Sequence, residues 1–449
     1  MVNTPDTNKT LRERFLDIDF SRTSSNEWYN SAPGDAARTS VRDAFIADES
    51  IVDPAIEYSL VHSIPYVQLE GEYLRLLDDA QLASDDVVYE QAARKLAEMY
   101  RHKEVRRRLA GDAINEALSI HRAEYMNEEL FGEIEQQDFD AVFSRLHDSA
   151  AALSNTLPQA RELTELVGSN VEVAGDVFDF ELQPETLELL RSDLFEIIPG
   201  LEKVLAPAQP GQIDAVEAAE WSQKILDVTG MTSVGWRAVV AKGKAASTSK
   251  KDKLIKYGEE RVFKSAAEMN KTNVHETIGH GYRSYMASKQ EDPRLRGSMP
   301  GTLAVEEGGA TVLEQIISGV PRRAGQRYLQ ALGFGKGLDR GGQPRSFRET
   351  YEVLYRSLMI EQAASGQEVD LLTAQRKAYQ ECMRTRRGGA LDARDISYFN
   401  GAKKINPWFN QIARLPEAQR RESLRIFLSG QFDPMDEAQA KLFGLNTGR

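Results

Sequence analysis

NVHETIGHGYR, residues 273–283, holds two of the six histidines of this 449-residue chain, with a glutamate directly after the first. Neutral imidazoles and carboxylates bind Zn²⁺ in sites that keep a fourth position for water. A neighbouring carboxylate can then take a proton from that water. The pattern predicts that His275 and His280 bind zinc and that Glu276 is the catalytic base. The alternative is two histidines satisfied on an ordinary helix.

The spacing of the two histidines is unusual for one helix. Residues five apart differ by about 140° around a regular α-helix, which would point the two imidazoles to different faces. A π-type turn takes up one extra residue and restores the phase. Gly279 is a position where such a distortion costs little. We therefore expect an irregular helix between Glu276 and His280.

A third ligand is expected from the next helical stretch, TLAVEEGGATVLEQII, which offers Glu306, Glu307 and Glu314. Its adjacent Gly308 and Gly309 are unfavourable inside a helix. They let another helix approach closely, which helps a short carboxylate to reach a metal on a neighbouring element. The alternative for these glutamates is a solvated helix face.

HETIGH followed by EEGGA resembles the tyrosine carboxypeptidase-like metallopeptidases. Bacterial relatives in that family are labelled flavohemoglobin expression-modulating proteins with a QEGLA motif, and eukaryotic relatives include the microtubule-associated tyrosine carboxypeptidase. The resemblance implies a zincin-like peptidase in which Glu307, rather than Glu306, is the third ligand. Its pattern also has an arginine three residues past the second histidine, here Arg283. Two departures, a shifted glycine at Gly279 and Gly309 in place of leucine, indicate a divergent member.

A later part of the family pattern looks like Asp395 and Tyr398 ending at Gly401, and weaker likeness covers Asp53-Pro54 to Tyr58 and NEELFGE at 127–133. Tyr398 is a candidate catalytic donor to the oxyanion, against an ordinary half-buried tyrosine. Arg283 is a candidate for binding a substrate carboxylate, against a brace for the acidic cluster.

The surrounding pattern predicts a helix-dominated α+β fold with a small sheet beside the metal-binding helix. Apolar residues at three- and four-residue spacings predict helices along most of 67–167, and over 184–198, 215–229, 266–289, 303–318, 347–364 and 371–386. Strands are expected at 235–243 and 252–258, with a further candidate at 171–180. The Lys-rich connection at 242–256 is either a solvated hairpin loop or an edge that attracts an acidic peptide.

Three regions are expected along the chain. Residues 1–50 are polar and predict a poorly ordered arm, 51–170 a helical subdomain, and 171–449 the zinc peptidase region.

Composition narrows the class of protein. The net charge is −13, which makes nucleic acid an unexpected partner. Cys382 is the single cysteine, which excludes an internal disulfide and fits a reducing compartment. No stretch reaches membrane-spanning length, so we expect a cytoplasmic protein without a membrane partner.

The expected function is a zinc-dependent carboxypeptidase with one Zn²⁺ per chain, acting on peptide or protein C-termini. Two rivals remain: a non-catalytic regulatory or binding protein on the same fold, and a zinc endopeptidase. The presence of Glu276 argues against the first, because a merely structural zinc site needs no base.

Overall fold

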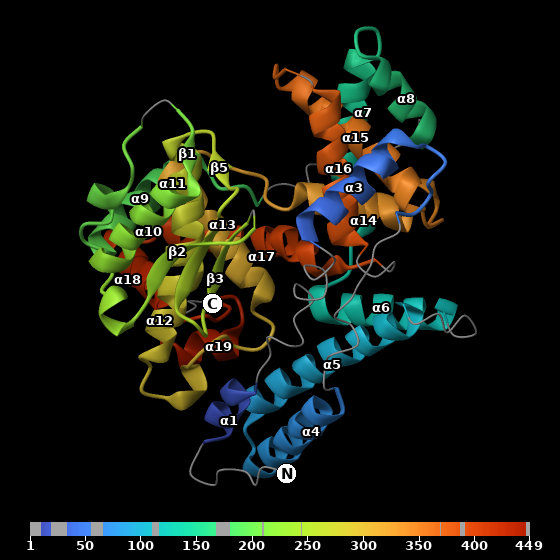
Figure 1. The fold of residues 1–449 in the computed structure, drawn as a ribbon. Coiled ribbons are helices and arrows are strands. Elements are labelled where there is room, and N and C mark those ends of the chain that lie inside the picture. Colours follow the sequence, from blue (N-terminus) through green and yellow to red (C-terminus); the bar gives the residue numbers. More distant parts are fainter. Residues whose placement is uncertain are drawn as a thin grey trace.

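The computed structural model describes residues 10–18, 34–54, 66–109, 116–167, 180–208, 211–243, 245–368, 370–386 and 391–445. Helices dominate, and a small sheet lies to one side, so the predicted helix-dominated α+β class is confirmed. Figure 1 shows a group formed by α1 and α4–α6 and, above it, two larger bodies of packed elements. We call them the sheet lobe, built from β1–β5, α9–α13 and α18, and the helical lobe, built from α3, α7, α8 and α14–α16.

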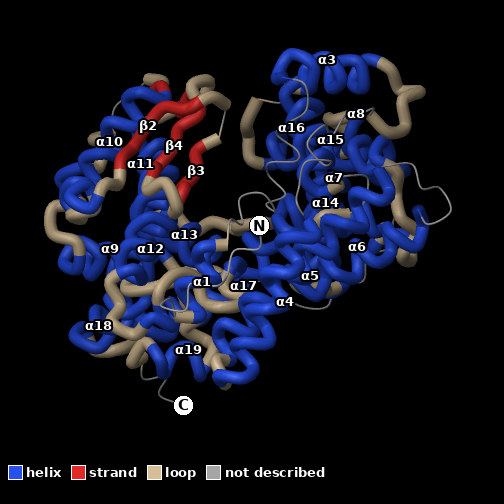
Figure 2. Tube along the Cα trace, turned by 60° about the horizontal axis from the view of Figure 1, so that its bottom comes forward, coloured by secondary structure: helices blue, strands red, loops and turns tan. Residues whose placement is uncertain are grey.

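The main sheet has three strands in the order β2-β4-β3. Strand β2 (Arg237–Ala241) runs parallel to β4 (Leu254–Gly258), and β3 (Ala246–Ser249) pairs antiparallel with the other side of β4. Figure 2 shows the three strands together at the edge of the sheet lobe. The two predicted strands are thus confirmed. The Lys-rich connection between them is not only a loop, because its small residues form the edge strand β3.

A second, two-stranded pair completes the β-structure of the described residues. Strand β1 (Ile213–Asp214) pairs antiparallel with β5 (Val262–Phe263). Burial of Ile213 and Phe263 joins this pair to the core that the main sheet shares with α10 and α11. The candidate strand at 171–180 lies outside the described residues, apart from Phe180.

The helices predicted from apolar spacing are present. They are α4 (Tyr66–Ala83), α5 (Asp86–Leu109), α6 (Glu116–Phe131), α9 (Pro184–Ile197), α10 (Ala215–Val228), α13 (Leu303–Ser318), α15 (Phe347–Ala364) and α16 (Leu371–Thr385). Helices α7 (Gln136–Leu153) and α8 (Pro158–Val167) complete the predicted stretch to residue 167. The sequence pattern did not predict α14 (Gln326–Lys336), α17 (Ser397–Ala413), α18 (Glu417–Leu428) or α19 (Glu437–Leu442).

Helix α17 joins the two lobes. Its first residues, including Phe399 and Ala402, pack in the core of the helical lobe. Its later residues, including Ile405 and Phe409, pack in the core of the sheet lobe. The long helix therefore fixes the position of Tyr398, at its start, against the sheet lobe.

Two glycines allow α13 and α17 to cross in backbone contact. A Cβ atom built on Gly308 would lie 2.5 Å from the carbonyl carbon of Gly401, and one on Gly401 would overlap the carbonyl oxygen of Ala304. A methyl group at either position would push the helices apart. A helix does approach closely at Gly308, as expected, but it is α17 and not the helix that carries the two histidines.

The hydrophobic cores do not follow the expected boundary at residue 170. Phe139 and Leu163, on α7 and α8, share one core with Phe334, Leu354 and Cys382, on α14–α16. Helices α4–α6 form a smaller separate core. The expected region 51–170 is thus divided between two packing units, because the apolar faces of α7 and α8 are covered by helices from the second half of the chain.

Two parts of the expected N-terminal arm are ordered. Helix α1 (Leu11–Asp17) begins with a capping box at Thr10, and Arg12 donates hydrogen bonds to the carbonyl oxygens of Arg296 and Ser298. Helix α3 (Gly34–Ala47) places Phe45 in the core of the helical lobe. These two segments of the predicted arm thus form helices that contact the rest of the protein.

A buried glutamate on α16 gives a test of the fold that is independent of the site. Burial raises the pKa of Glu381 to about 7, although Arg327 and Lys377 act in the opposite direction. Because this folded pKa lies above the unfolded value, the carboxyl group destabilises the protein increasingly as pH rises from about 4.5 through 7. We expect Glu381→Gln to stabilise the protein by about 1–3 kcal/mol at pH 8 and to have little effect near pH 4.5.

Urea denaturation at both pH values measures this difference. Glu368→Gln, which changes an exposed glutamate, is the matched control and should be nearly neutral at both. Equal effects of Glu381→Gln at the two pH values would contradict the assigned burial cost.

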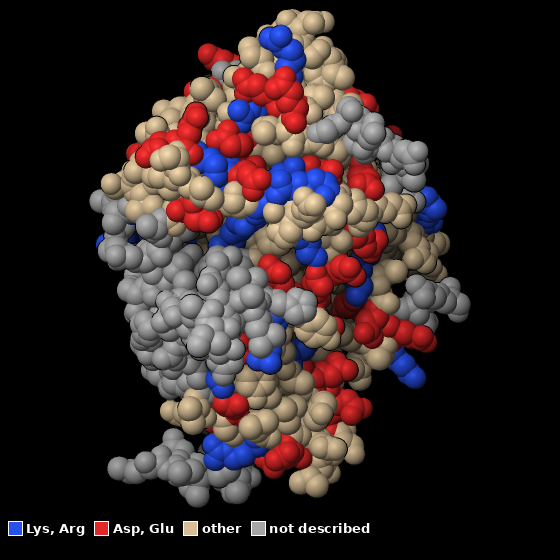
Figure 3. All heavy atoms as spheres, turned by 90° about the vertical axis from the view of Figure 1, so that its right-hand side faces the viewer, with Lys and Arg blue, Asp and Glu red and all other residues tan. Residues whose placement is uncertain are grey.

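No described helix is both long and apolar enough to cross a membrane. On the face drawn in Figure 3, acidic and basic side chains are interspersed.

Candidate metal centre

The histidine string lies in a π-helical segment. Helix α11 (Ala266–Val274) continues without a break into a π-helix at His275–Tyr282 and then into α12 (Arg283–Ser288). The wider turn returns His280 to the face of His275, as the five-residue spacing required. The predicted helix irregularity is confirmed.

Gly279 within this turn serves close packing. A Cβ atom at this position would lie 2.6 Å from the Cβ atom of Ala310 on α13. The absence of a side chain lets the π-helix settle directly on α13, the helix that carries the candidate glutamates.

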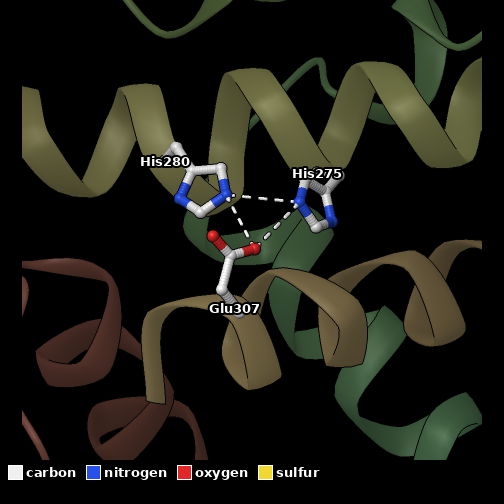
Figure 4. A group of neighbouring side chains, drawn as sticks. All are labelled: His275, His280 and Glu307. Carbon is white, nitrogen blue, oxygen red and sulfur yellow. Dashed lines mark hydrogen bonds and ion pairs between the residues drawn. The ribbon is translucent and has the colours of Figure 1, made fainter. Parts of the chain in front are cut away.

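Three side chains converge between these two helices (Figure 4). The Nε2 atoms of His275 and His280 are 3.2 Å apart. The Oε2 atom of Glu307 lies 3.7 Å from the first and 3.6 Å from the second. Ligand atoms roughly 2.0–2.2 Å from one tetrahedral ion would lie roughly 3.3–3.6 Å apart. The three expected ligands are therefore brought together at separations that suit a small cation.

The charge balance at this point also suits a cation. Glu307 is largely buried, and its Oε2 atom has no hydrogen-bond partner among the described residues. A buried carboxylate requires a compensating positive charge. Burial acts to raise the pKa of Glu307, but the interactions with His280 and His275 together outweigh it and hold that pKa well below its usual value. A proton on an imidazole, or a metal ion between the three groups, can supply this charge.

Glu314 orients the first histidine. Its Oε1 atom lies 2.7 Å from Nδ1 of His275, on the side of the ring opposite the candidate metal position. Nδ1 of His275 has no hydrogen-bond partner of good geometry among the described residues, so this contact with Glu314 is electrostatic; a carboxylate at this distance favours the tautomer with a proton on Nδ1, which leaves Nε2 free as a ligand. Glu307 and Glu314 are seven residues, or about two helical turns, apart, so α13 supplies both groups from one face.

Glu306, the other candidate ligand, points elsewhere. Its Oε2 atom accepts a hydrogen bond of 2.8 Å from Nζ of Lys250. Burial raises the pKa of Glu306, but Lys250 and His280 outweigh this effect and lower it. Of the three glutamates considered, Glu307 is the one at the centre.

Glu276 is held by the edge strand. The hydroxyl of Thr248, on β3, donates to the Oε2 atom of Glu276 at 2.7 Å and lies 2.8 Å from its backbone carbonyl oxygen. The first contact orients the carboxylate of Glu276, and the second ties the backbone of the same residue to β3. Thr248 gave no signal in the sequence, because it lies in a stretch of small polar residues.

A cavity of about 250 Å³ opens beside the centre and is lined by Glu276, His275 and Tyr398. The ring of Tyr398 lies 5.7 Å from that of Tyr328, which also lines the cavity. Burial and the charge of Glu307 hold the pKa of Tyr398 well above its usual value. The phenol thus keeps its proton and remains a hydrogen-bond donor at neutral pH.

Arg283 does not reach this cavity. Its side chain is fully buried, and its Nε atom donates to the carbonyl oxygens of Phe427 and Gly430 at 3.2 and 2.9 Å. Its guanidinium group also lies 4.0 Å from the ring centroid of Phe427. The structure therefore does not bring Arg283 to the cavity, and its position gives no support to the expected contact with a substrate carboxylate. Arg283 instead anchors the end of α18 against α12.

The packing of Phe427 over Arg283 also explains why Gly309 stands where the family pattern has leucine. A Cβ atom there would lie 2.6 Å from Cζ of Phe427, so a leucine would displace the ring that covers Arg283.

Of the remaining motif residues, Asp395 accepts a hydrogen bond from Arg384 and Asp53 accepts one from the backbone N–H of Phe347. Tyr58 lies outside the described residues.

Comparison of the chain with protein-family models, with curated proteins and with solved structures gives no significant match. The site is therefore characterised by its own geometry.

Proposed function

We propose that the protein is a zinc-dependent peptidase in which His275, His280 and Glu307 hold the metal. The observation that carries this proposal is the π-helix that turns two histidines, five residues apart, toward one buried and otherwise unpartnered carboxylate oxygen. A regular α-helix is the more stable backbone conformation, and π-turns occur mostly at functional sites.

The residues around the centre have complementary roles. His275, His280 and Glu307 would hold the zinc ion, which when bound would supply a water molecule of lowered pKa as the nucleophile. Glu276, held by Thr248, has the role of general base that accepts a proton and of general acid that returns it to the leaving amine. Tyr398 donates its phenol hydrogen to the oxygen of the attacked carbonyl group. Glu314 maintains the tautomer of His275.

The family resemblance of HETIGH and EEGGA supports a carboxypeptidase on a zincin-like fold, with peptide or protein C-termini as substrates. An endopeptidase with the same centre and a regulatory protein without turnover are the two competing functions. They differ in measurable products, since the first cuts internal bonds and the second cuts none.

The first test is metal content. We expect about one zinc per chain after purification in zinc-supplemented medium and dialysis, and less than a tenth of that for His280→Ala. His147→Ala, which removes a histidine from α7 in the helical lobe, should keep the full content. Mass spectrometry of the intact complex and elemental analysis measure both. Full zinc content in His280→Ala would contradict the ligand assignment.

A further inference from the structure

The cavity beside the metal centre contains two arginines, Arg261 and Arg322. The side chain of Arg261 is 35% exposed, with its guanidinium over the ring of Phe263 and near Glu268. The side chain of Arg322 is 61% exposed. Arg322 thus presents the larger cationic surface to a molecule in the cavity.

Arg322 is tied to the metal centre through one residue. Its Nη1 atom donates to the Oε2 atom of Glu314 at 2.7 Å, and the other oxygen of Glu314 lies 2.7 Å from Nδ1 of His275. The backbone N–H of Arg322 also donates to the side-chain oxygen of Gln315 at 2.7 Å. The backbone and the guanidinium of Arg322 are therefore both anchored to α13, the helix that carries Glu307.

The guanidinium keeps donors for a second partner. Of its five N–H groups, the contact with Glu314 uses one, and the exposed remainder can bind a carboxylate bidentately. Arg261 also lines the cavity, but its guanidinium group is already engaged with Phe263 and Glu268, whereas Glu276 and Glu314 face the same cavity as carboxylates. The carboxylates of Glu276 and Glu314 therefore repel an anionic group that enters the cavity, whereas Arg322 attracts it.

We propose that Arg322 binds the C-terminal carboxylate of the peptide substrate, with Glu314 as the positioning residue that holds it. This inference rests on the proposed peptidase function and makes the enzyme an exopeptidase. The carboxylate of a last residue lies only about one residue, roughly 3.8 Å between Cα atoms, beyond the bond that a carboxypeptidase cuts. Arg322 is a candidate for that role because it lines the same cavity as Glu276 and Tyr398 and contacts the metal centre through Glu314 and His275.

The experiment compares a peptide acid with its C-terminal amide. A peptide library with free C-termini first identifies a substrate, which is then synthesised in both forms. We expect amidation to lower kcat/KM at least about 30-fold, because the amide has no charge with which to form the charge-assisted, bidentate contact with Arg322. Arg322→Ala should lose a similar factor on the acid and little more on the amide. Arg322→Lys should recover part of the loss, since it keeps the charge without the bidentate geometry.

Arg323→Ala is the matched control. This neighbouring arginine is 42% exposed, forms an ion pair with Glu181 and does not line the cavity. It should leave the ratio of acid to amide unchanged. Peptide binding to the Glu276→Gln protein, measured by fluorescence anisotropy with and without Arg322→Ala, supplies a readout that does not depend on turnover. Zinc content and thermal melting confirm that each variant is folded and loaded.

Three outcomes overturn the inference. Equal cleavage of acid and amide at internal bonds would show an endopeptidase and leave the zinc proposal intact. Sensitivity to amidation that disappears in Arg261→Ala but persists in Arg322→Ala would place the carboxylate at Arg261. Absence of zinc, or of cleavage of any peptide by the wild-type protein, would reject the proposed function together with this inference.

Discussion

Glu276→Gln is expected to retain about one zinc ion per chain and to lower kcat for peptide hydrolysis by about 10²- to 10⁴-fold. The substitution preserves the shape of the side chain and removes the group that accepts the proton from water. The hydroxyl of Thr248 can still donate to the amide oxygen, so the side chain should keep its position. Steady-state hydrolysis together with elemental analysis separates loss of the base from loss of the metal.

Thr248→Val provides a graded comparison with Glu276→Gln. It removes the hydroxyl that contacts Glu276 but keeps the β-branched shape suited to strand β3. A smaller loss of kcat, with zinc content unchanged, is expected from a less firmly positioned carboxylate. Normal turnover in Glu276→Gln would show that another group accepts the proton and that the assigned mechanism is wrong.

Gly308→Ala is expected to destabilise the protein by about 3 kcal/mol or more, because the added methyl group meets backbone rather than a movable side chain. Its Cβ atom would lie 2.5 Å from the carbonyl carbon of Gly401. Separation of α13 from α17 would also move Glu307 and Tyr398 relative to each other. We expect a lower midpoint of urea unfolding and weaker zinc retention in the same variant.

Gly71→Ala is the matched control for this prediction. Gly71 lies inside α4, and no atom stands within 4 Å of a Cβ built there. Without a clash, alanine should stabilise the helix by about 0.5–1 kcal/mol through its higher helix propensity. If Gly308→Ala were as stable as the wild-type protein, the close crossing of α13 and α17 would not be as described.

Local pattern was enough for much of the fold and for part of the site. The helices that carry the two histidines and Glu307, and the strands β2 and β4, follow from apolar spacing and β-propensity, which depend on neighbouring residues alone. The irregular turn before His280 was predictable for a similar reason, since a five-residue spacing cannot align two ligands on a regular helix. The short strand β3 was missed because AASTS carries neither apolar alternation nor bulky β-branched residues beyond Thr248.

Which charged side chains reach the site depends on ion pairs and hydrogen bonds between segments that are distant in the sequence. By itself, the sequence determined that His275, Glu276 and His280 share one turn and that a glutamate of 302–317 is needed beside them. The residues alone left Glu306, Glu307 and Glu314 open and the family resemblance implied Glu307; the tertiary structure brings Glu307 to the histidines, whereas Lys250 pairs with Glu306 across the fold. Likewise, Arg283 is buried by the end of α18 while Arg322 stands in the cavity. Spacing along a chain specifies which side chains share a helix face, whereas solvent exposure and ion-pair partners depend on segments that meet only after folding.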